Sequence, residues 1–162
     1  MNRKTKMALI LITLVVALPA LALAQEKPAD TMQLVVEKIR ADKKLLVAEN
    51  MGLSEAEAKV FWPVYDRYQD ELFLLRQRTA RLIGDYAAAY ANMTEETAKT
   101  LLDEYLTIEA LGVKLRQTYL PKLLKLLPAV KVVRYIQIEN KINAALMYEL
   151  GGQIPLIKDA SK

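Results

Sequence analysis

Residues 54–91 decide the fold class, and they read SEAEAKVFWPVYDRYQDELFLLRQRTARLIGDYAAAYA. The stretch opens with Ser54-Glu55-Ala56-Glu57, a capping box in which a serine hydroxyl and a glutamate carboxylate satisfy backbone N–H groups of the first helical turn. Apolar or small side chains then recur at alternating spacings of four and three residues: Phe61, Tyr65, Tyr68, Leu72, Leu75, Thr79, Leu82, Tyr86 and Ala89. Because this heptad pattern is typical of helices that pack along another helix, we predict one long helix over 54–91.

A second long helix is predicted after the turn Asn92-Met93-Thr94, with Thr94 as its N-cap. Its heptad positions are Ala98, Leu101, Tyr105, Ile108, Gly112, Leu115 and Tyr119. Two such helices joined by a short turn form an antiparallel hairpin, in which Gly112 would let the partner backbone approach closely. Pro63 and Pro121 lie at similar distances from the turn, so we expect a bent hairpin.

Two further helices are predicted on either side of this hairpin. One spans 31–49 and is terminated by Asn50-Met51-Gly52, since glycine adopts the left-handed cap conformation. The other starts with Pro128 in its first turn, runs to about Leu150 and ends at Gly151-Gly152. We expect the tail 153–162 to be extended. With no period-two alternation that would indicate strands, the prediction is an all-α fold of four helices.

Residues 1–24 have a different composition and match a secretory signal peptide. A basic start is followed by an apolar run from Met7 to Leu18 and by the small-residue cleavage site Ala22-Leu23-Ala24. An uncleaved membrane anchor is the alternative, but Pro19 and the cleavage site favour removal. We therefore predict a bacterial periplasmic protein whose mature chain, 25–162, is a single helical domain with no stable membrane span.

The charge of the predicted mature chain is balanced overall but uneven along its length. Three of the 23 basic residues lie in the signal, which leaves 20 basic residues against 19 acidic ones. Residues 25–109 carry 11 basic and 16 acidic residues, whereas residues 110–162 carry 9 basic and 3 acidic residues. The near-neutral total disfavours nucleic acid as a partner. The basic half either neutralises the acidic half or attracts an acidic partner or anionic membrane surface, and we favour neutralisation.

Residue types needed for ordinary enzymatic chemistry are missing. The chain has no histidine and no cysteine, which excludes a Ser-His-Asp triad, a thiol nucleophile and histidine or thiolate metal sites. Disulfides and a lipid-anchoring cysteine are excluded as well. Carboxylates cluster at two places and could hold calcium or act as an acid/base pair: Asp66 and Asp70, and Glu95, Glu96, Asp103 and Glu104. We favour a solvated helix face, and expect no enzyme, no cofactor and no metal.

Candidate binding residues lie near Pro63 and in the basic second half of the chain. They are Trp62, Lys122, Lys125, Lys131, Arg134 and Tyr135. Trp62, the only tryptophan, lies off the heptad positions of its helix, so it either packs against a neighbouring helix or is exposed for binding. We favour packing for Trp62, and Tyr135 raises the same question.

The architecture resembles that of the Spy/CpxP-like periplasmic proteins, which are described by an LTxxQ motif that occurs twice. Leu53-Ser54-Glu55-Ala56-Glu57 stands at the first motif position and Leu127-Pro128-Ala129-Val130-Lys131 at the second, each opening a helix. Neither copy has the glutamine, and the second lacks the Ser/Thr cap. The resemblance implies a cradle of four helices, often dimeric, that acts in the envelope stress response as an ATP-independent chaperone or as an inhibitor of a sensor kinase.

The function predicted from the sequence is a periplasmic, non-enzymatic protein-binding module. Its expected partners are unfolded or envelope proteins or a sensor kinase domain, with a homodimer implied by the resemblance. The alternative is a structural or assembly subunit, in which the last helix and the tail 153–157, with its apolar run Ile154-Pro155-Leu156-Ile157, pack into a stable partner.

Overall fold

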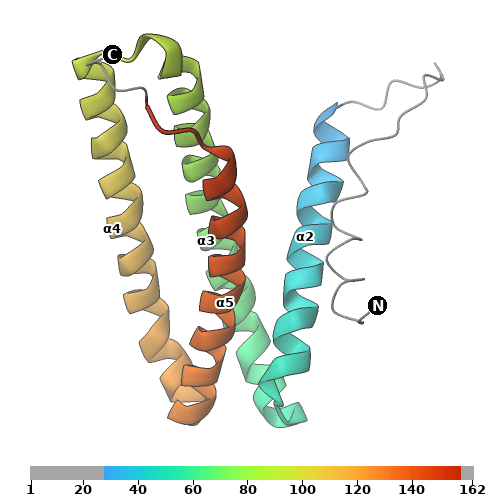
Figure 1. The fold of residues 1–162 in the computed structure, drawn as a ribbon. Helices are drawn as coiled ribbons and strands as arrows, with labels where there is room; N and C mark the ends of the chain where they lie inside the picture. Colours follow the sequence, from blue (N-terminus) through green and yellow to red (C-terminus); the bar gives the residue numbers. More distant parts are fainter. Residues whose placement is uncertain (1–27, 158–162) are drawn as a thin grey trace, which may run out of the picture. The chain divides into compact units, whose positions relative to one another are not determined.

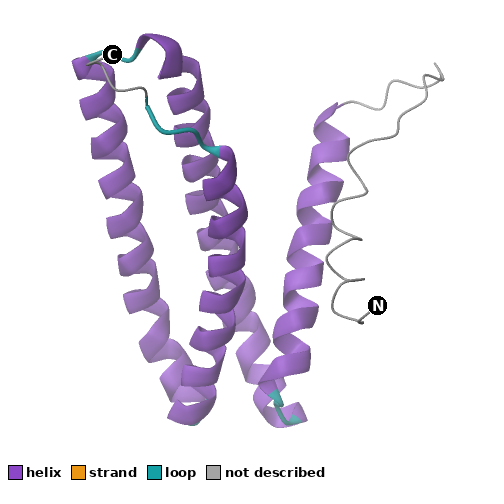
Figure 2. Ribbon diagram, viewed as in Figure 1, coloured by secondary structure: helices purple, strands orange, loops and turns teal. Residues whose placement is uncertain are grey.

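The computed structural model describes residues 28–157, with side chains from Arg40 onward. Within this range the chain is helical and has no strand, so the all-α prediction is confirmed (Figures 1 and 2). The predicted signal peptide, 1–24, lies outside the described residues. The elements are α2 (Pro28–Met51), α3 (Glu55–Ala89), the short 3-10 helix η1 (Tyr90–Asn92), α4 (Glu95–Leu126) and α5 (Ala129–Gln153). The chain divides into two units at Arg40, and the packing described below is that of the second unit, Ala41–Lys162.

The predicted helix starts are formed by the expected side chains. The Ser54 backbone N–H donates to the Glu57 carboxylate at 2.8 Å, and the Glu57 N–H donates to the Ser54 hydroxyl at 3.3 Å, which completes the capping box. Thr94 accepts a hydrogen bond from the Thr97 N–H at 3.1 Å at the start of α4. Gly52 has a φ of +56°, the left-handed conformation expected after α2.

The limits of α5 differ from the prediction at both ends. Pro128 is the N-cap rather than a first-turn residue, and its carbonyl accepts from the N–H groups of Lys131 and Val132. The helix also continues through Gly151-Gly152 to Gln153. It stops there because the residue before a proline is disfavoured in the helical region: Ile154 precedes Pro155 and is extended, with φ −93° and ψ 109°.

Helices α3 and α4 lie side by side and antiparallel (Figure 1). Tyr68 contacts Tyr119 with ring centroids 5.3 Å apart, and further along α3 the Arg78 guanidinium pairs with Glu104. The expected close approach of backbones at Gly112 is wrong. A Cβ added there would lie 3.6 Å from the Leu75 Cδ2 atom, an ordinary van der Waals distance, so the position does not require glycine.

The core gathers at the end of the α3–α4 pair where α2 meets α3 and α4 meets α5. Its buried members are Val47 and Met51 of α2; Phe61, Tyr65 and Tyr68 of α3; Leu115, Tyr119 and Leu123 of α4; Leu127; and Val132 and Tyr135 of α5. Towards η1 the heptad side chains of α3 are only partly buried. On α4, Tyr105 is 52% exposed, so this heptad side chain is not buried between the two helices.

Candidate functional site

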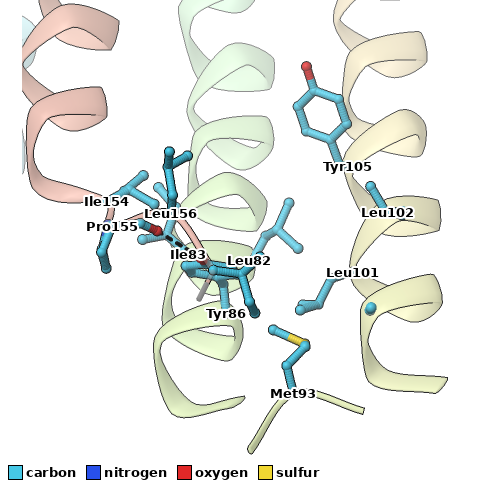
Figure 3. Close-up of a pocket in the computed structure, with 12 residues that line it drawn as sticks. Leu82, Ile83, Tyr86, Met93, Leu101, Leu102, Tyr105, Ile154, Pro155 and Leu156 are labelled. Atoms are coloured by element: carbon cyan, nitrogen blue, oxygen red, sulfur yellow. Dashed lines mark hydrogen bonds between the residues drawn. The ribbon is translucent and has the colours of Figure 1, made fainter. Parts of the chain in front are cut away.

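An apolar pocket lies at the η1 end of the α3–α4 pair, opposite the core, and has a volume of about 560 Å³ (Figure 3). We call it the tip pocket. Its lining comes from α3, the α3–α4 turn, α4 and the segment after α5: Leu82, Ile83, Tyr86, Met93, Ala98, Leu101, Leu102, Tyr105, Ile154, Pro155, Leu156 and Ile157. No lining residue carries a charge, so the pocket suits an apolar ligand.

The segment 154–157, which we call the tail segment, forms one side of the tip pocket and is attached to α3 through its backbone. The Tyr86 hydroxyl donates to the Pro155 carbonyl at 2.7 Å, and the Tyr90 hydroxyl donates to the Leu156 carbonyl at 3.1 Å. The two tyrosines are one helical turn apart and their rings are 5.9 Å apart. Two neighbouring carbonyls are therefore bound by the hydroxyls of Tyr86, in α3, and Tyr90, the first residue of η1.

The tip pocket leaves much apolar surface in contact with solvent. Leu102 is 60% exposed and Tyr105 is 52% exposed on the α4 side, while Leu156 of the tail segment is 90% exposed. Figure 3 shows the Tyr105 hydroxyl pointing away from the other lining residues. The tail segment therefore covers the pocket incompletely, and apolar side chains are available for a further contact.

A second distinctive group of polar residues lies near the core and joins three helices. The Lys43 ammonium lies 2.8 Å from the Glu139 carboxylate and 2.7 Å from the Gln69 carbonyl oxygen. The Gln69 amide donates to Glu139 at 3.1 Å and to the Tyr135 hydroxyl at 3.4 Å. Burial lowers the pKa of Lys43, while the nearby carboxylate of Glu139 acts in the opposite direction. Because the charges are paired and hydrogen-bonded, the group cross-links α2, α3 and α5.

The structure corrects the placement of Tyr135 on the surface, since this side chain is only 1% exposed. Its ring contacts Phe61 at 5.3 Å in an edge-to-face arrangement and forms part of the aromatic core. Burial raises the pKa of Tyr135, with the carboxylate of Glu139 as the next cause. The sequence leaves open whether this side chain packs or binds, and the structure places it in the core.

Trp62 packs against its neighbours, as favoured from the sequence. It is half-buried, lies 5.0 Å from the Phe61 ring and 5.2 Å from the Tyr65 ring, and has the Lys44 ammonium 5.1 Å from its centroid. Lys44 also pairs with Asp66 at 2.6 Å. Trp62 therefore joins the edge of the core to the charged surface of α2.

The four basic candidates fall into two groups. Lys131 pairs with Glu57 and donates to the Gly52 carbonyl, while Arg134 donates to the Asn50 carbonyl, so both hold the α2–α3 turn. The pair of Lys131 with Glu57 joins a basic residue of the second half to an acidic residue of the first, whereas Arg134 binds an uncharged carbonyl. Lys122 and Lys125 are exposed on α4, and the Lys122 ammonium lies 4.2 Å from the centroid of the Tyr119 ring.

The carboxylate clusters have neighbours that account for part of their charge. Glu104 pairs with Arg78, and this pairing lowers the pKa of Glu104. Glu95 lies 3.9 Å from Lys99. Among residues whose side chains the structure describes, no group of three or more potential ligands could hold a metal ion.

Sequence reasoning missed the tip pocket. Tyr86 was recognised as a heptad position, but its hydroxyl contact lies far along the chain, in the tail segment. The available signal was the apolar run Ile154-Pro155-Leu156-Ile157 after a helix. Pro155 in this run lacks a backbone N–H group, which indicates that the segment does not continue the helix.

Comparisons with known proteins found no match to the chain among family models, curated proteins or solved structures. The Spy/CpxP-like resemblance therefore stays a hypothesis from the sequence. In the part of the chain that the structure describes, no helix has the length and apolar content needed to cross a membrane.

Proposed function

We propose that this chain is a periplasmic, non-enzymatic protein-binding module that holds apolar segments of partly unfolded envelope proteins, as an ATP-independent chaperone or a modulator of envelope stress. The observation that carries the proposal is the tip pocket, an uncharged hollow on which an extended apolar peptide segment already lies. The exposed side chains of Leu102 and Tyr105 add apolar area for a client. Export rests on the signal peptide predicted for residues 1–24.

The test is suppression of aggregation by the purified protein, without nucleotide, of a chemically unfolded client at equal molar ratio. Leu102→Asn should weaken suppression severalfold, because it places an amide on an exposed, apolar wall of the tip pocket. Val130→Asn is the matched control, since Val130 is 81% exposed on α5 and is not part of the pocket lining. Absence of suppression at severalfold excess would refute the chaperone function.

The contribution of the basic surface can be tested at Lys122 and Lys125. Both are exposed, whereas Lys131 and Arg134 hold the α2–α3 turn and their replacement would also disturb the fold. Lys122→Glu combined with Lys125→Glu should weaken binding of an acidic client at low salt. Unchanged affinity would remove these two residues from the binding surface.

A structural or assembly subunit is the second candidate, and exposed leucines and a valine on α4 favour it. Leu106, Val113, Leu120 and Leu124 are 62%, 46%, 39% and 48% exposed and follow one another at spacings of seven, seven and four residues. Such a face suits a stable helical partner. Crosslinking in intact cells, followed by purification, should recover one stoichiometric partner if this function holds, and Val113→Asp should release it.

A further inference from the structure

The tail segment shows how the tip pocket holds a peptide. Ile154 is extended and the following residues are not helical, so the segment presents its backbone to α3. Tyr86 and Tyr90 bind the carbonyls of two consecutive residues, at 2.7 Å and 3.1 Å. Every residue has a carbonyl, so these contacts do not depend on which side chains the peptide carries.

Other features restrict the class of peptide. The lining is apolar and uncharged. A peptide with a charged side chain is therefore disfavoured, because no polar group of the pocket would replace the water molecules that hydrate the charge. A volume of about 560 Å³ falls within the range of ligand pockets and remains beside the tail segment. The eight lining residues that lie outside the tail segment are likewise uncharged, so the surface that the tail segment covers suits an extended segment of apolar residues.

The tail segment itself is held loosely enough to be displaced. Leu156 is 90% exposed and Ile157 is 48% exposed, so Leu156 contributes almost no buried apolar area and Ile157 is only half-buried. The tail segment nevertheless stays bound because it is covalently attached to α5. Such a short tether gives the segment an effective concentration of about a millimolar at the pocket. A partner segment that fills the pocket more completely can compete with it.

The following inference rests on the proposed function. We propose that the tip pocket recognises extended apolar polypeptide segments by binding consecutive main-chain carbonyls with the hydroxyls of Tyr86 and Tyr90. The tail segment occupies these two hydroxyls until a partner displaces it. The tail segment thereby limits binding to partners that outcompete it. The same two hydroxyls hold the resident segment and its replacement.

The experiment measures binding of a fluorescently labelled peptide with the sequence of residues 151–157, GGQIPLI, by anisotropy. Ile154→Asp combined with Ile157→Asp should release the tail segment, because both residues line the uncharged pocket. If the segment occupies the site for about 90% of the time or more, its release tightens peptide binding at least tenfold. Circular dichroism verifies that the variant remains helical.

The hydroxyls are tested in this released variant, where no resident segment competes. Tyr86→Phe and Tyr90→Phe should each weaken peptide binding about 2- to 10-fold, the effect of one lost hydrogen bond. Tyr148→Phe is the matched control, since Tyr148 is 82% exposed on α5 and should leave binding unchanged. Equal affinity in all tyrosine variants would overturn carbonyl recognition, and no tightening on release would overturn the role of the tail segment.

The outcomes also separate this inference from the proposed function. Aggregation suppression without peptide binding to the released variant would overturn the inference and leave the chaperone function standing. Peptide binding that depends on both hydroxyls, without suppression, would support the inference and refute the chaperone function. A dimer that dissociates when the tail segment is substituted would place the segment in a second copy's pocket and overturn the intramolecular arrangement.

Discussion

Replacing Glu139 by glutamine should strongly destabilise the protein, because it leaves the Lys43 charge buried without a counter-charge. The Lys43 and Glu139 side chains are only 10% and 9% exposed, and their charged atoms are 2.8 Å apart. Breaking a fully buried pair costs about 3–5 kcal/mol. Gln69 still accepts from Lys43 and the pair keeps some contact with water, so we expect the lower end, about 3 kcal/mol.

The assay is urea unfolding at pH 7, followed by circular dichroism. The double variant Lys43→Met with Glu139→Leu removes both charges and should return stability to within about 1 kcal/mol of the original, since an apolar pair of similar size replaces a buried ion pair at little cost. Glu95→Gln is the control. Its pair with Lys99 is 3.9 Å long, with side chains 76% and 95% exposed, and should contribute less than about 0.5 kcal/mol.

The pH dependence of the stability of Glu139→Gln is a second, independent test of the Lys43–Glu139 pair. Burial already lowers the pKa of Lys43 in the folded protein, and removal of the Glu139 charge should lower it further. Between the lowered pKa of the folded protein and the ordinary lysine pKa, the unfolded chain binds more protons than the folded one, so the stability of Glu139→Gln should rise with pH across that interval. A loss below about 1 kcal/mol, with no steeper rise towards alkaline pH, would refute the reasoning.

Three further predictions test the core, α4 and the capping box. Phe61→Ala should cost about 3–5 kcal/mol, because Phe61 is completely buried; Val130→Ala, at an 81% exposed position, should change stability by less than about 0.5 kcal/mol in the same urea assay. Gly112→Ala should stabilise by about 0.5–1 kcal/mol, since alanine is the better helix former and its Cβ makes only ordinary contact with Leu75; a lower melting temperature would show that the helices are closer there. Hydrogen bonds, first from Lys131 and then from the Ser54 backbone, lower the pKa of Glu57 to about 2. The folded pKa lies below the unfolded one, so this contribution is present above about pH 4.5 and is lost as pH falls towards 2. Acid titration should show a smaller loss in Glu57→Gln, and equal losses would contradict the pairing.

The long helices could be predicted from the sequence because their signals are local. The capping box at Ser54, the cap at Thr94 and the terminator Gly52 each act within a few residues, and each forms as predicted. The heptad pattern of α3 likewise depends only on spacing. The two glycines predict too early an end for α5, because Pro155 and its steric effect on Ile154 terminate the helix instead.

The sequence does not predict the tip pocket and leaves the burial of Tyr135 open, because both depend on contacts between distant segments. Tyr86 meets the tail segment across 69 residues of sequence, and Gln69 meets Tyr135 across 66. Helical periodicity identifies which residues share a face but does not say which other segment covers that face. The same limit applies to Lys131 and Arg134: their charge predicts a binding surface, but it does not reveal their contacts with the α2–α3 turn.

The concentration of the core at one end of the α3–α4 pair has a consequence for how the protein opens. Amide protons near Phe61 and Tyr119 lie beside the buried aromatic cluster and should exchange with solvent only through global unfolding. Those near Leu82 and Leu101 lie where side chains are only partly buried, so fraying of the helix ends can expose them while the aromatic end stays intact. We therefore expect the two ends of these helices to open separately, so that rearrangement around the tip pocket leaves the aromatic end intact.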